Sequence, residues 1–214
     1  MQMNLKNYKR NKRLINIKII KLNSKNLLIF LISLSIIAII IGIVFYFILS
    51  STDQETVNRV VTNNFKIKDS YDYVRVLKEN ILSNTYNVVL IWILGISVIG
   101  IIANIFIYFF ELFSIGFTIS SIIMTYKNKS IIGILIYLFP TTILNVIAMF
   151  ILTYFSIKIS YKIISICFFN KNIDLKKEMK QYFKVLLVCW ILSLCISLLS
   201  TYINPVLIKT FTNI

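Results

Sequence analysis

Few residues of this chain have side chains suited to catalysis. The sequence contains no histidine, which excludes Ser-His-Asp triads, histidine-based zinc sites and histidine-ligated haem. Its three cysteines, Cys167, Cys189 and Cys195, lie in apolar runs without metal-ligand spacing, and their odd number argues against a disulfide framework. No phosphate-binding loop and no pair of carboxylates is present. The sequence therefore predicts a protein that is not an enzyme, with no cofactor and no metal.

Glu111 is the residue with the greatest chemical potential. It is the only acidic residue between Glu79 and Asp174, and long apolar runs surround it. A carboxylate inside a membrane span is costly and by default suggests an ion or proton path. The charge pattern places Glu111 near the inner edge of a span, where water or a lysine reaches it. That position favours a structural role over an ion path, which stays open as the alternative.

Other polar and aromatic residues of the apolar runs have structural interpretations. Asparagines in or at the ends of spans are expected to form hydrogen bonds between helices, each worth about 1 kcal/mol. Tyrosine and tryptophan suit the aromatic belts at the membrane surface. The asparagines are Asn104, Asn145 and Asn204, and the aromatic residues are Tyr86, Trp92 and Tyr202.

Small residues and a proline predict how the helices pack and break. Gly116 and Ser120 form a small-xxx-small pair, as do Ser193 and Ser197, and such pairs let two helices approach closely. Pro140, with the two threonines after it, marks a break in a helix. Helix breaks form substrate sites in some transporters, but the sequence has no internal repeat that would supply a second, paired break.

The composition determines the elements that must position these residues. Of the 214 residues, 58% are hydrophobic and only 14% are charged, with a net charge of +15. An average soluble chain is about 25% charged, so the charges are too few to cover a soluble surface. Disorder is excluded by the high hydrophobicity. The composition predicts an all-α, polytopic transmembrane bundle in the cell membrane.

The amino-terminal region predicts the orientation. Residues 1–26 hold eight basic residues and no acidic one, and the uncharged run 27–49 follows directly. That run has the length of one span and is too long for the core of a signal peptide. A basic flank of this kind stays in the cytoplasm, so it predicts a cytoplasmic amino terminus rather than a nucleic-acid-binding arm.

Residues 50–85 form the one long polar stretch between apolar runs, and they are predicted to be an outer-side loop. Their basic and acidic residues balance, as on the outer side of a membrane. Apolar residues at helical spacing predict two short helices, with Asp69 or Ser70 capping the second. The loop lies on the bilayer surface, docks a partner, or is a short helical connector packed on the span ends.

Residues 86–214 are expected to complete the transmembrane bundle, giving about five spans with a short or re-entrant helix in the middle. The lysine-rich loop 170–184 is expected in the cytoplasm, Lys127 and Lys129 are expected outside, and Asn204-Pro205 is expected to end the last helix. The predicted segments are a span over 86–110, a short span over 111–126, a partial helix up to Pro140, and spans over 141–165 and 185–203.

Three motifs resemble those of the stage II sporulation protein M family. The stretch from Asn84 to Gly100 contains Trp-Ile-Leu-Gly-Ile-Ser and resembles a stretch of that family. The element Gly116-Phe117-Thr118 and the closing Tyr202-x-x-Pro205-x-Leu pattern are similar to later family elements, and Pro140 matches a mid-membrane proline. The residues that carry the first and last motifs are Trp92, Gly95, Ser97, Gly100 and Pro205.

The resemblance implies a membrane protein of sporulation and engulfment. In that family the protein works with stage II sporulation proteins D and P, which degrade septal peptidoglycan, and it localises and organises them without catalysing a reaction. Distant relatives carry a Pro-His-Gly element with a nearby Glu, where this chain has Pro140-Thr141-Thr142 and Asn145, so any role of that His or Glu does not transfer. The alternative is a small transporter or permease-like subunit with a polar cavity around Glu111, Asn104 and Asn145. Expected partners besides the two hydrolases are the lipid bilayer and a second copy of the chain, and nucleic acid is not expected.

Overall fold

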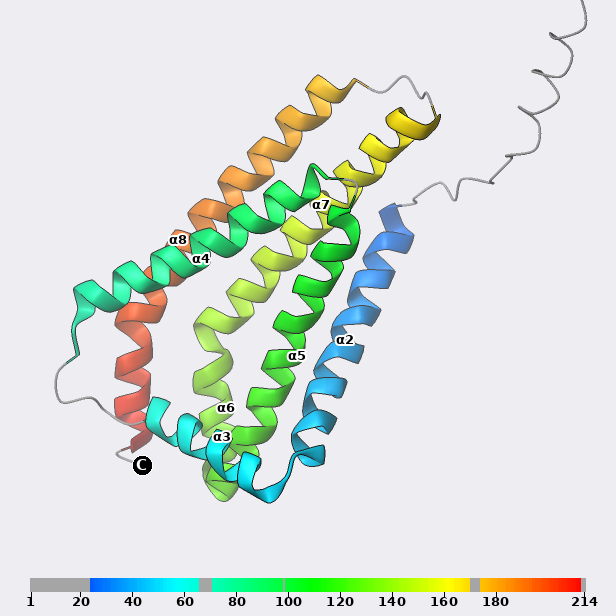
Figure 1. The fold of residues 1–214 in the computed structure, drawn as a ribbon. Helices are drawn as coiled ribbons and strands as arrows, with labels where there is room; N and C mark the ends of the chain where they lie inside the picture. The colour runs from blue at the N-terminus through cyan, green and yellow to red at the C-terminus, as the bar shows by residue number, and fades with distance from the viewer. Residues whose placement is uncertain (1–23, 66–70, 98, 170–173, 213–214) are drawn as a thin grey trace, which may run out of the picture.

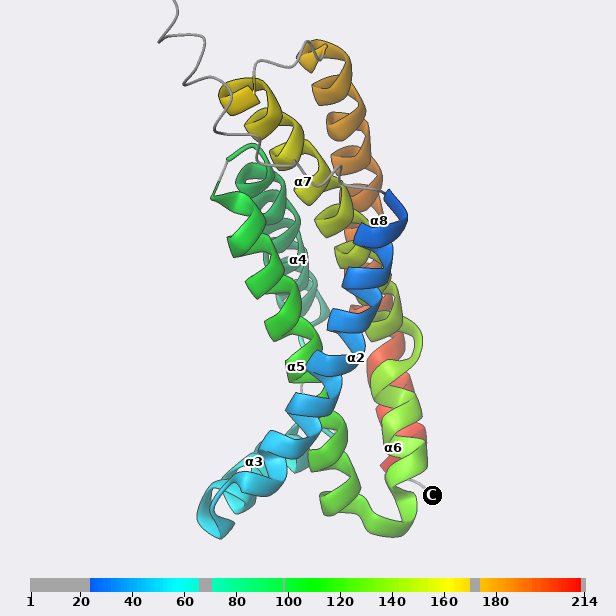
Figure 2. The same ribbon diagram turned by 90° about the vertical axis from the view of Figure 1, so that its right-hand side faces the viewer.

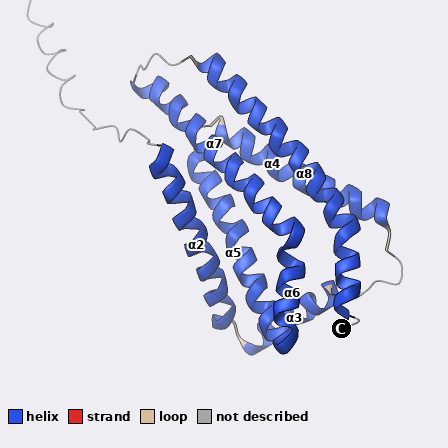
Figure 3. Ribbon diagram, turned by 180° about the vertical axis from the view of Figure 1, so that it is seen from behind, coloured by secondary structure: helices blue, strands red, loops and turns tan. Residues whose placement is uncertain are grey.

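The computed structural model describes residues 24–65, 71–97, 99–169 and 174–212, and within these ranges every regular element is a helix (Figures 1 and 3). Most of the predicted basic arm lies outside the described residues. The elements in order are α2 (Ser24–Ile48), α3 (Ser51–Asn64), α4 (Tyr73–Gly95), α5 (Gly100–Tyr126), a 3₁₀ turn (Lys127–Lys129), α6 (Ser130–Tyr137), a π turn (Leu138–Thr142), α7 (Ile143–Phe169) and α8 (Leu175–Thr212).

The long helices run side by side in alternating directions, and α3 lies across one end of the bundle (Figures 1 and 2). Helices α2, α5 and α8 begin at the same end as α4 and α7 finish, and we call this the Ser24 end. The opposite end holds α3, the turn between α5 and α6, and the end of α8, and we call it the Lys127 end. The predicted cytoplasmic segments, the basic arm and the loop between α7 and α8, both adjoin the Ser24 end.

Four helical segments are long and apolar enough to cross a membrane, which confirms the all-α polytopic fold. They are Ser24–Ile48, Gly100–Tyr137, Ile143–Cys167 and Leu175–Thr210. Helix α4 runs beside these four as a fifth long helix. It has 23 residues, which is about 35 Å at 1.5 Å per residue, but its first half is too polar for the helix to be recognised as a membrane span by composition. The outward faces are strongly apolar: Ile29, Ile36 and Phe47 of α2 are each more than half exposed. A surface of this kind suits lipid.

The predicted span over 86–110 is wrong, because the chain turns in the middle of that stretch. Helix α4 ends at Gly95 and α5 begins at Gly100, so the uncharged run belongs to two antiparallel helices. The segment 111–126 is the second half of α5 and not a separate short span. Glu111 consequently lies in the middle of the bundle and not at its inner edge.

The short middle helix is present as α6, but it is not re-entrant. It continues through a kink into α7, and the two helices form one path from the Lys127 end to the Ser24 end (Figure 2). The kink lies at Phe139, whose φ of −107° and ψ of 136° are not helical. This residue precedes Pro140, and a proline pushes the residue before it out of the α conformation. The predicted break is therefore a bend inside a span.

Helix α8 begins earlier and ends later than the predicted 185–203. Asp174 caps its start by accepting a hydrogen bond from the Lys177 amide over 3.2 Å. The helix then passes through Pro205 and reaches Thr212. A proline removes one backbone hydrogen bond, and helices in a bundle tolerate that loss by bending. Pro205 therefore does not end the last helix.

The loop 50–85 contains the first predicted short helix as α3, while the second is the beginning of α4. The cap of α4 is Asp72, whose Oδ1 accepts hydrogen bonds from the amides of Val74 and Arg75, both over 3.1 Å. Asp69 and Ser70, the predicted caps, lie outside the described residues. The polar segment is thus largely helical and continuous with the bundle.

Helices α2 and α5 pack closely through glycines on both sides. A Cβ atom on Gly116 would clash with the backbone of Ile39, and one on Gly42 would clash with the carbonyl of Phe113. Phe117, next to Gly116, packs against Phe45 and Tyr46 of α2 with ring centroids 6.2 and 5.7 Å apart. The Gly-Phe-Thr element therefore lies at the contact of two helices.

Replacing Gly116 with leucine is expected to separate α2 from α5, because the obstacle is backbone and cannot rotate away. Overpacking of this kind costs about 1–3 kcal/mol or more. The measurement is the thermal unfolding midpoint of the purified full chain in detergent. Val44→Leu, on the exposed face of α2, is the control and should unfold like wild type. An unchanged midpoint for Gly116→Leu would contradict the close α2–α5 packing.

Candidate functional site

Helix α3 is fastened to the bundle at Asn58. The Oδ1 atom of Asn58 accepts a hydrogen bond from the Tyr46 hydroxyl over 2.8 Å and one from the Ser121 hydroxyl over 3.1 Å. Both donors are fully buried, so α2 and α5 hold the same atom of α3. On the same side, Val61 and Phe65 pack with the buried Ile122. These contacts fix α3 in one position.

The other side of α3 faces away from the bundle. Glu55 and Arg59 form an ion pair over 2.7 Å with side chains 65% and 74% exposed. A pair this exposed contributes little to stability, so its residues are available for contacts with a partner. The remaining members of this face are Asp53, Thr56, Val60 and Asn63. We call the six residues the α3 face.

Polar groups of α5, α7 and α8 hold the end of α4 where the chain turns into α5. The end of any helix leaves carbonyl groups without intrahelical partners, and in lipid each must be satisfied. The carbonyl of Ile91 accepts a hydrogen bond from Asn104 over 3.3 Å, that of Trp92 from Tyr182 over 3.1 Å, and that of Gly95 from Ser160 over 2.6 Å. Asn104 also donates to Ser156. These bonds hold the end of α4, where Gly95 is buried, while Ile96, Ser97 and Ile99 of the turn itself are exposed.

The Trp-Ile-Leu-Gly-Ile-Ser motif is this turn. A Cβ atom on Gly95 would clash with Tyr182 and Ser156, and one on Gly100 would clash with the carbonyl of Leu94. The Ser97 hydroxyl accepts a hydrogen bond from the Ile99 amide over 3.3 Å.

Trp92, expected in an aromatic belt, instead stacks on Tyr182 at 5.8 Å between ring centroids. The motif therefore forms the connection between α4 and α5. Asn104 is fully buried because its side-chain amide donates to the end of α4.

Helices α4 and α8 are joined by a polar row that the sequence analysis did not single out. Asn80 donates to Thr201 over 3.0 Å, and Asn84 donates to Ser197 over 2.9 Å. The spacing of four residues on both helices is the signal that was available in the sequence. Ser197 is also a member of the predicted small-xxx-small pair with Ser193. In the structure Ser197 of this pair contacts Asn84 in the middle of α4.

Glu111 and Asn145 are brought together at the centre of the bundle. The Asn145 side-chain amide donates to Oε1 of Glu111 over 2.8 Å, joining α7 to α5. Both residues line a chamber of about 190 Å³. Its walls are mostly polar and come from α4, α5, α7, α8 and the kink; they include Asn80, Asn84, Ser114, Tyr137, Thr141, Thr142 and Ser200. We call this space the inner chamber.

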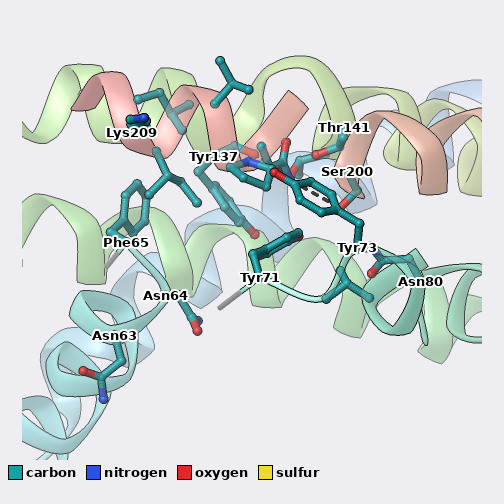
Figure 4. Close-up of a pocket in the computed structure, with 17 residues that line it drawn as sticks. Asn63, Asn64, Phe65, Tyr71, Tyr73, Asn80, Tyr137, Thr141, Ser200 and Lys209 are labelled. Carbon is teal, nitrogen blue, oxygen red and sulfur yellow. Dashed lines mark hydrogen bonds between the residues drawn. The ribbon is translucent and has the colours of Figure 1, made fainter. Parts of the chain in front are cut away.

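The inner chamber borders a larger cavity of about 970 Å³ toward the Lys127 end, and Figure 4 shows the larger cavity. The two share Asn80, Tyr137, Thr141, Thr142 and Ser200 as lining residues. Tyr71 and Tyr73 lie beside each other at the larger cavity, 4.7 Å between ring centroids. Burial, and after it the neighbouring Tyr73, raises the pKa of Tyr71 above its ordinary value, so this wall stays uncharged at neutral pH.

The remaining predicted site residues lie apart from this chamber. Asn104 belongs to the α4–α5 turn, seven residues and about 10 Å along α5 from Glu111. The Ser120 hydroxyl donates to the carbonyl of Gly116 within its own helix over 3.2 Å. Asn204 donates to Ser200, also within its helix, over 3.3 Å, and it lines the larger cavity together with Pro205.

Metal-binding and redox sites do not stand out in the described part of the chain. Within it, no three residues with histidine, cysteine or carboxylate side chains lie close enough to hold a metal ion. The three cysteines are unbridged there, with Cys189 buried and the other two exposed.

One comparison with known proteins gives a match. A family model described as stage II sporulation protein M matches residues 27–205, which is more than four fifths of the chain. No curated protein and no solved structure matches. The matched range includes α3, the α4–α5 turn and the lining of the inner chamber, while the lining of the larger cavity continues beyond it to Lys209.

Proposed function

Because the chain belongs to the stage II sporulation protein M family, as a multi-pass membrane protein of sporulation, we propose that it recruits and organises peptidoglycan hydrolases during engulfment. The partners are stage II sporulation proteins D and P, and the chain itself is a non-catalytic scaffold in this proposal. The observation that carries it is the α3 face, a polar helical surface held rigidly at one end of the bundle.

The position of α3 supports this role. The hydrolases act on peptidoglycan, outside the cytoplasmic membrane, so their docking surface must lie on the outer side. Both lysine-rich predicted cytoplasmic segments adjoin the Ser24 end, and α3 lies at the opposite end. By the excess of basic residues in cytoplasmic loops, the Lys127 end faces outward in our proposal. This orientation presents the α3 face to the compartment where the hydrolases work.

A charge swap on the α3 face tests the proposal without disturbing the fold. In the variant Glu55→Arg/Arg59→Glu/Val60→Ser, the ion pair is reversed, the net charge is kept and only exposed side chains change. The expected result is loss of most hydrolase D and P from a pull-down of the tagged chain out of sporulating cells. Deleting the whole segment would be less informative, because it would remove Asn58 and Val61, which hold α3 on the bundle.

The matched control changes another exposed part of the same end. Asn128→Ser/Lys129→Glu lies in the turn between α5 and α6, away from the α3 face, and it should leave hydrolase recovery at the wild-type level. Equal recovery with the charge-swapped chain and with wild type would contradict docking on α3.

The alternative, a small transporter or permease-like subunit, is favoured by one specific observation. The polar cavity that it requires lies around Glu111 and Asn145, although Asn104 is not part of it. Glu111→Gln separates the two functions. The scaffold account expects this variant to support engulfment, whereas the transport account expects engulfment to fail while the hydrolases still co-purify.

A further inference from the structure

We propose that the inner chamber binds a cationic group, either an alkali-metal cation or a small alkylammonium, with Glu111 as its counter-charge. The site goes beyond the scaffold role, because hydrolase docking on α3 does not require it. The ligand would enter from the Lys127 end through the larger cavity. The juxtaposition that carries the proposal is one carboxylate, neutral oxygen-rich walls and an open approach, all inside a membrane bundle.

The charge balance of the chamber is the first argument. Among the residues that line it, Glu111 is the only one with an ionisable acidic or basic side chain apart from the Tyr137 phenol. Its contact with Asn145 occupies Oε1 and supplies no positive charge. An uncompensated carboxylate at the centre of a membrane protein is strongly unfavourable. A bound cation would remove that cost.

A second carboxylate of the same chain, that of Glu178, differs from Glu111 because its charge is compensated within the protein. Glu178 of α8 is also partly buried, with its side chain 26% exposed, and it forms an ion pair with Lys162 of α7. This pair compensates both charges within the protein. Glu111 is joined to a neutral amide instead, so its charge is left for a ligand.

The walls of the inner chamber have the chemistry of a cation site. Hard cations and ammonium groups both prefer oxygen ligands, and Thr141, Ser200 and Tyr137, which bear hydroxyls, line the same chamber as the Glu111 carboxylate. The α6–α7 kink borders the same space, and broken helices form ion sites in membrane proteins because they expose backbone carbonyls. About 190 Å³ accommodates a small cation with part of its water shell.

The larger cavity is suitable as an entry route for a cation to the inner chamber. The larger cavity has a volume within the range of ordinary ligand pockets, about 300–1,000 Å³, and shares five lining residues with the chamber. Its walls carry amides, hydroxyls and aromatic rings beside several aliphatic side chains, and they include one basic residue, Lys209. A ligand therefore reaches Glu111 without crossing the apolar outer face of the bundle.

Carbodiimide labelling of the full chain tests the site. Dicyclohexylcarbodiimide adds to protonated carboxyl groups, and peptide mass spectrometry locates the adduct. The chain in detergent is labelled in tetrabutylammonium chloride, whose cation is too bulky for the chamber, and in sodium, potassium or methylammonium chloride at equal ionic strength. Glu55 and Glu79, which are exposed, serve as internal controls in the same digest.

The expected result is labelling of Glu111 that a small cation slows by about tenfold at a concentration ten times its Kd, with no change at the controls. Protection by sodium or potassium alone identifies an alkali-metal site, and protection by methylammonium alone identifies an ammonium site. The same Glu111 labelling rate in all four salts would overturn the proposal, and so would absence of Glu111 labelling in every salt. The test measures the labelling of Glu111 in the wild-type chain alone. It therefore does not depend on whether a Glu111→Gln variant folds.

Discussion

Replacing Gly95 with leucine is expected to abolish accumulation of folded protein in the membrane. The leucine side chain would occupy the position of the Tyr182 and Ser156 hydroxyls, which belong to the group that satisfies the end of α4. Displacing them adds overpacking of about 1–3 kcal/mol to the loss of hydrogen bonds that cost several kcal/mol each when unmade in lipid. The total equals much of the stability of an ordinary domain, about 5–15 kcal/mol.

The measurement is the amount of full-length chain recovered from membranes and its thermal unfolding midpoint. Ile93→Leu is the control, because Ile93 lies on the same helix but is 55% exposed. It should accumulate like wild type. Normal accumulation and an unchanged midpoint for Gly95→Leu would mean that Gly95 does not pack against Tyr182 and Ser156 at the end of α4.

Replacing Asn58 with leucine is expected to release α3 from the bundle and to abolish recruitment of the hydrolases together with it. The leucine cannot accept the hydrogen bonds of Tyr46 and Ser121, whose hydroxyls are buried. Each unsatisfied group costs about 1–3 kcal/mol. A total of about 3 kcal/mol shifts the equilibrium between docked and released α3 by more than a hundredfold, since 1.4 kcal/mol corresponds to tenfold.

Limited trypsin digestion of the purified chain measures the release, because cleavage after Arg59 requires the helix to open. The expected result is rapid cleavage at this site, accompanied by loss of hydrolases D and P from the pull-down. Thr56→Ala, an exposed change on the same helix, should resist trypsin like wild type. Slow cleavage in Asn58→Leu would contradict the anchoring, and rapid cleavage with full hydrolase recovery would contradict docking on an ordered α3.

The fold class could be predicted from the sequence because backbone polar groups inside a bilayer must form hydrogen bonds within the protein. Apolar runs such as 27–49 must be helices in a bilayer, and α2 indeed covers nearly the same residues. The family could also be predicted, because the Trp-Ile-Leu-Gly-Ile-Ser run is distinctive. The place of this run in the structure could not be predicted, since the stretch from 86 to 110 carries no charge, and its Gly95, Ser97 and Gly100 are residues that also occur inside membrane spans. The partners that allow the turn, among them Tyr182 and Ser160, lie far away in the sequence.

The inner chamber could be predicted only in part, because the polar cavity expected around Glu111, Asn104 and Asn145 includes Glu111 and Asn145 but not Asn104. Glu111 and Asn145 were both singled out, but the misplaced turn put Glu111 at the edge of a span instead of the middle. Asn80 and Asn84 belong to a stretch that was interpreted as an outer loop. Their contribution depends on α4 crossing beside α8, which is a property of the tertiary structure and not of any local pattern.

The most direct test of the central claim is the position of the hydrolases in sporulating cells. Hydrolases D and P carrying fluorescent tags are imaged at the septum in three strains: one that produces this chain, one that lacks it, and one that produces the charge-swapped α3 variant. The account predicts septal fluorescence in the first strain and diffuse membrane fluorescence in the other two. Septal hydrolases in the strain that lacks the chain would contradict it.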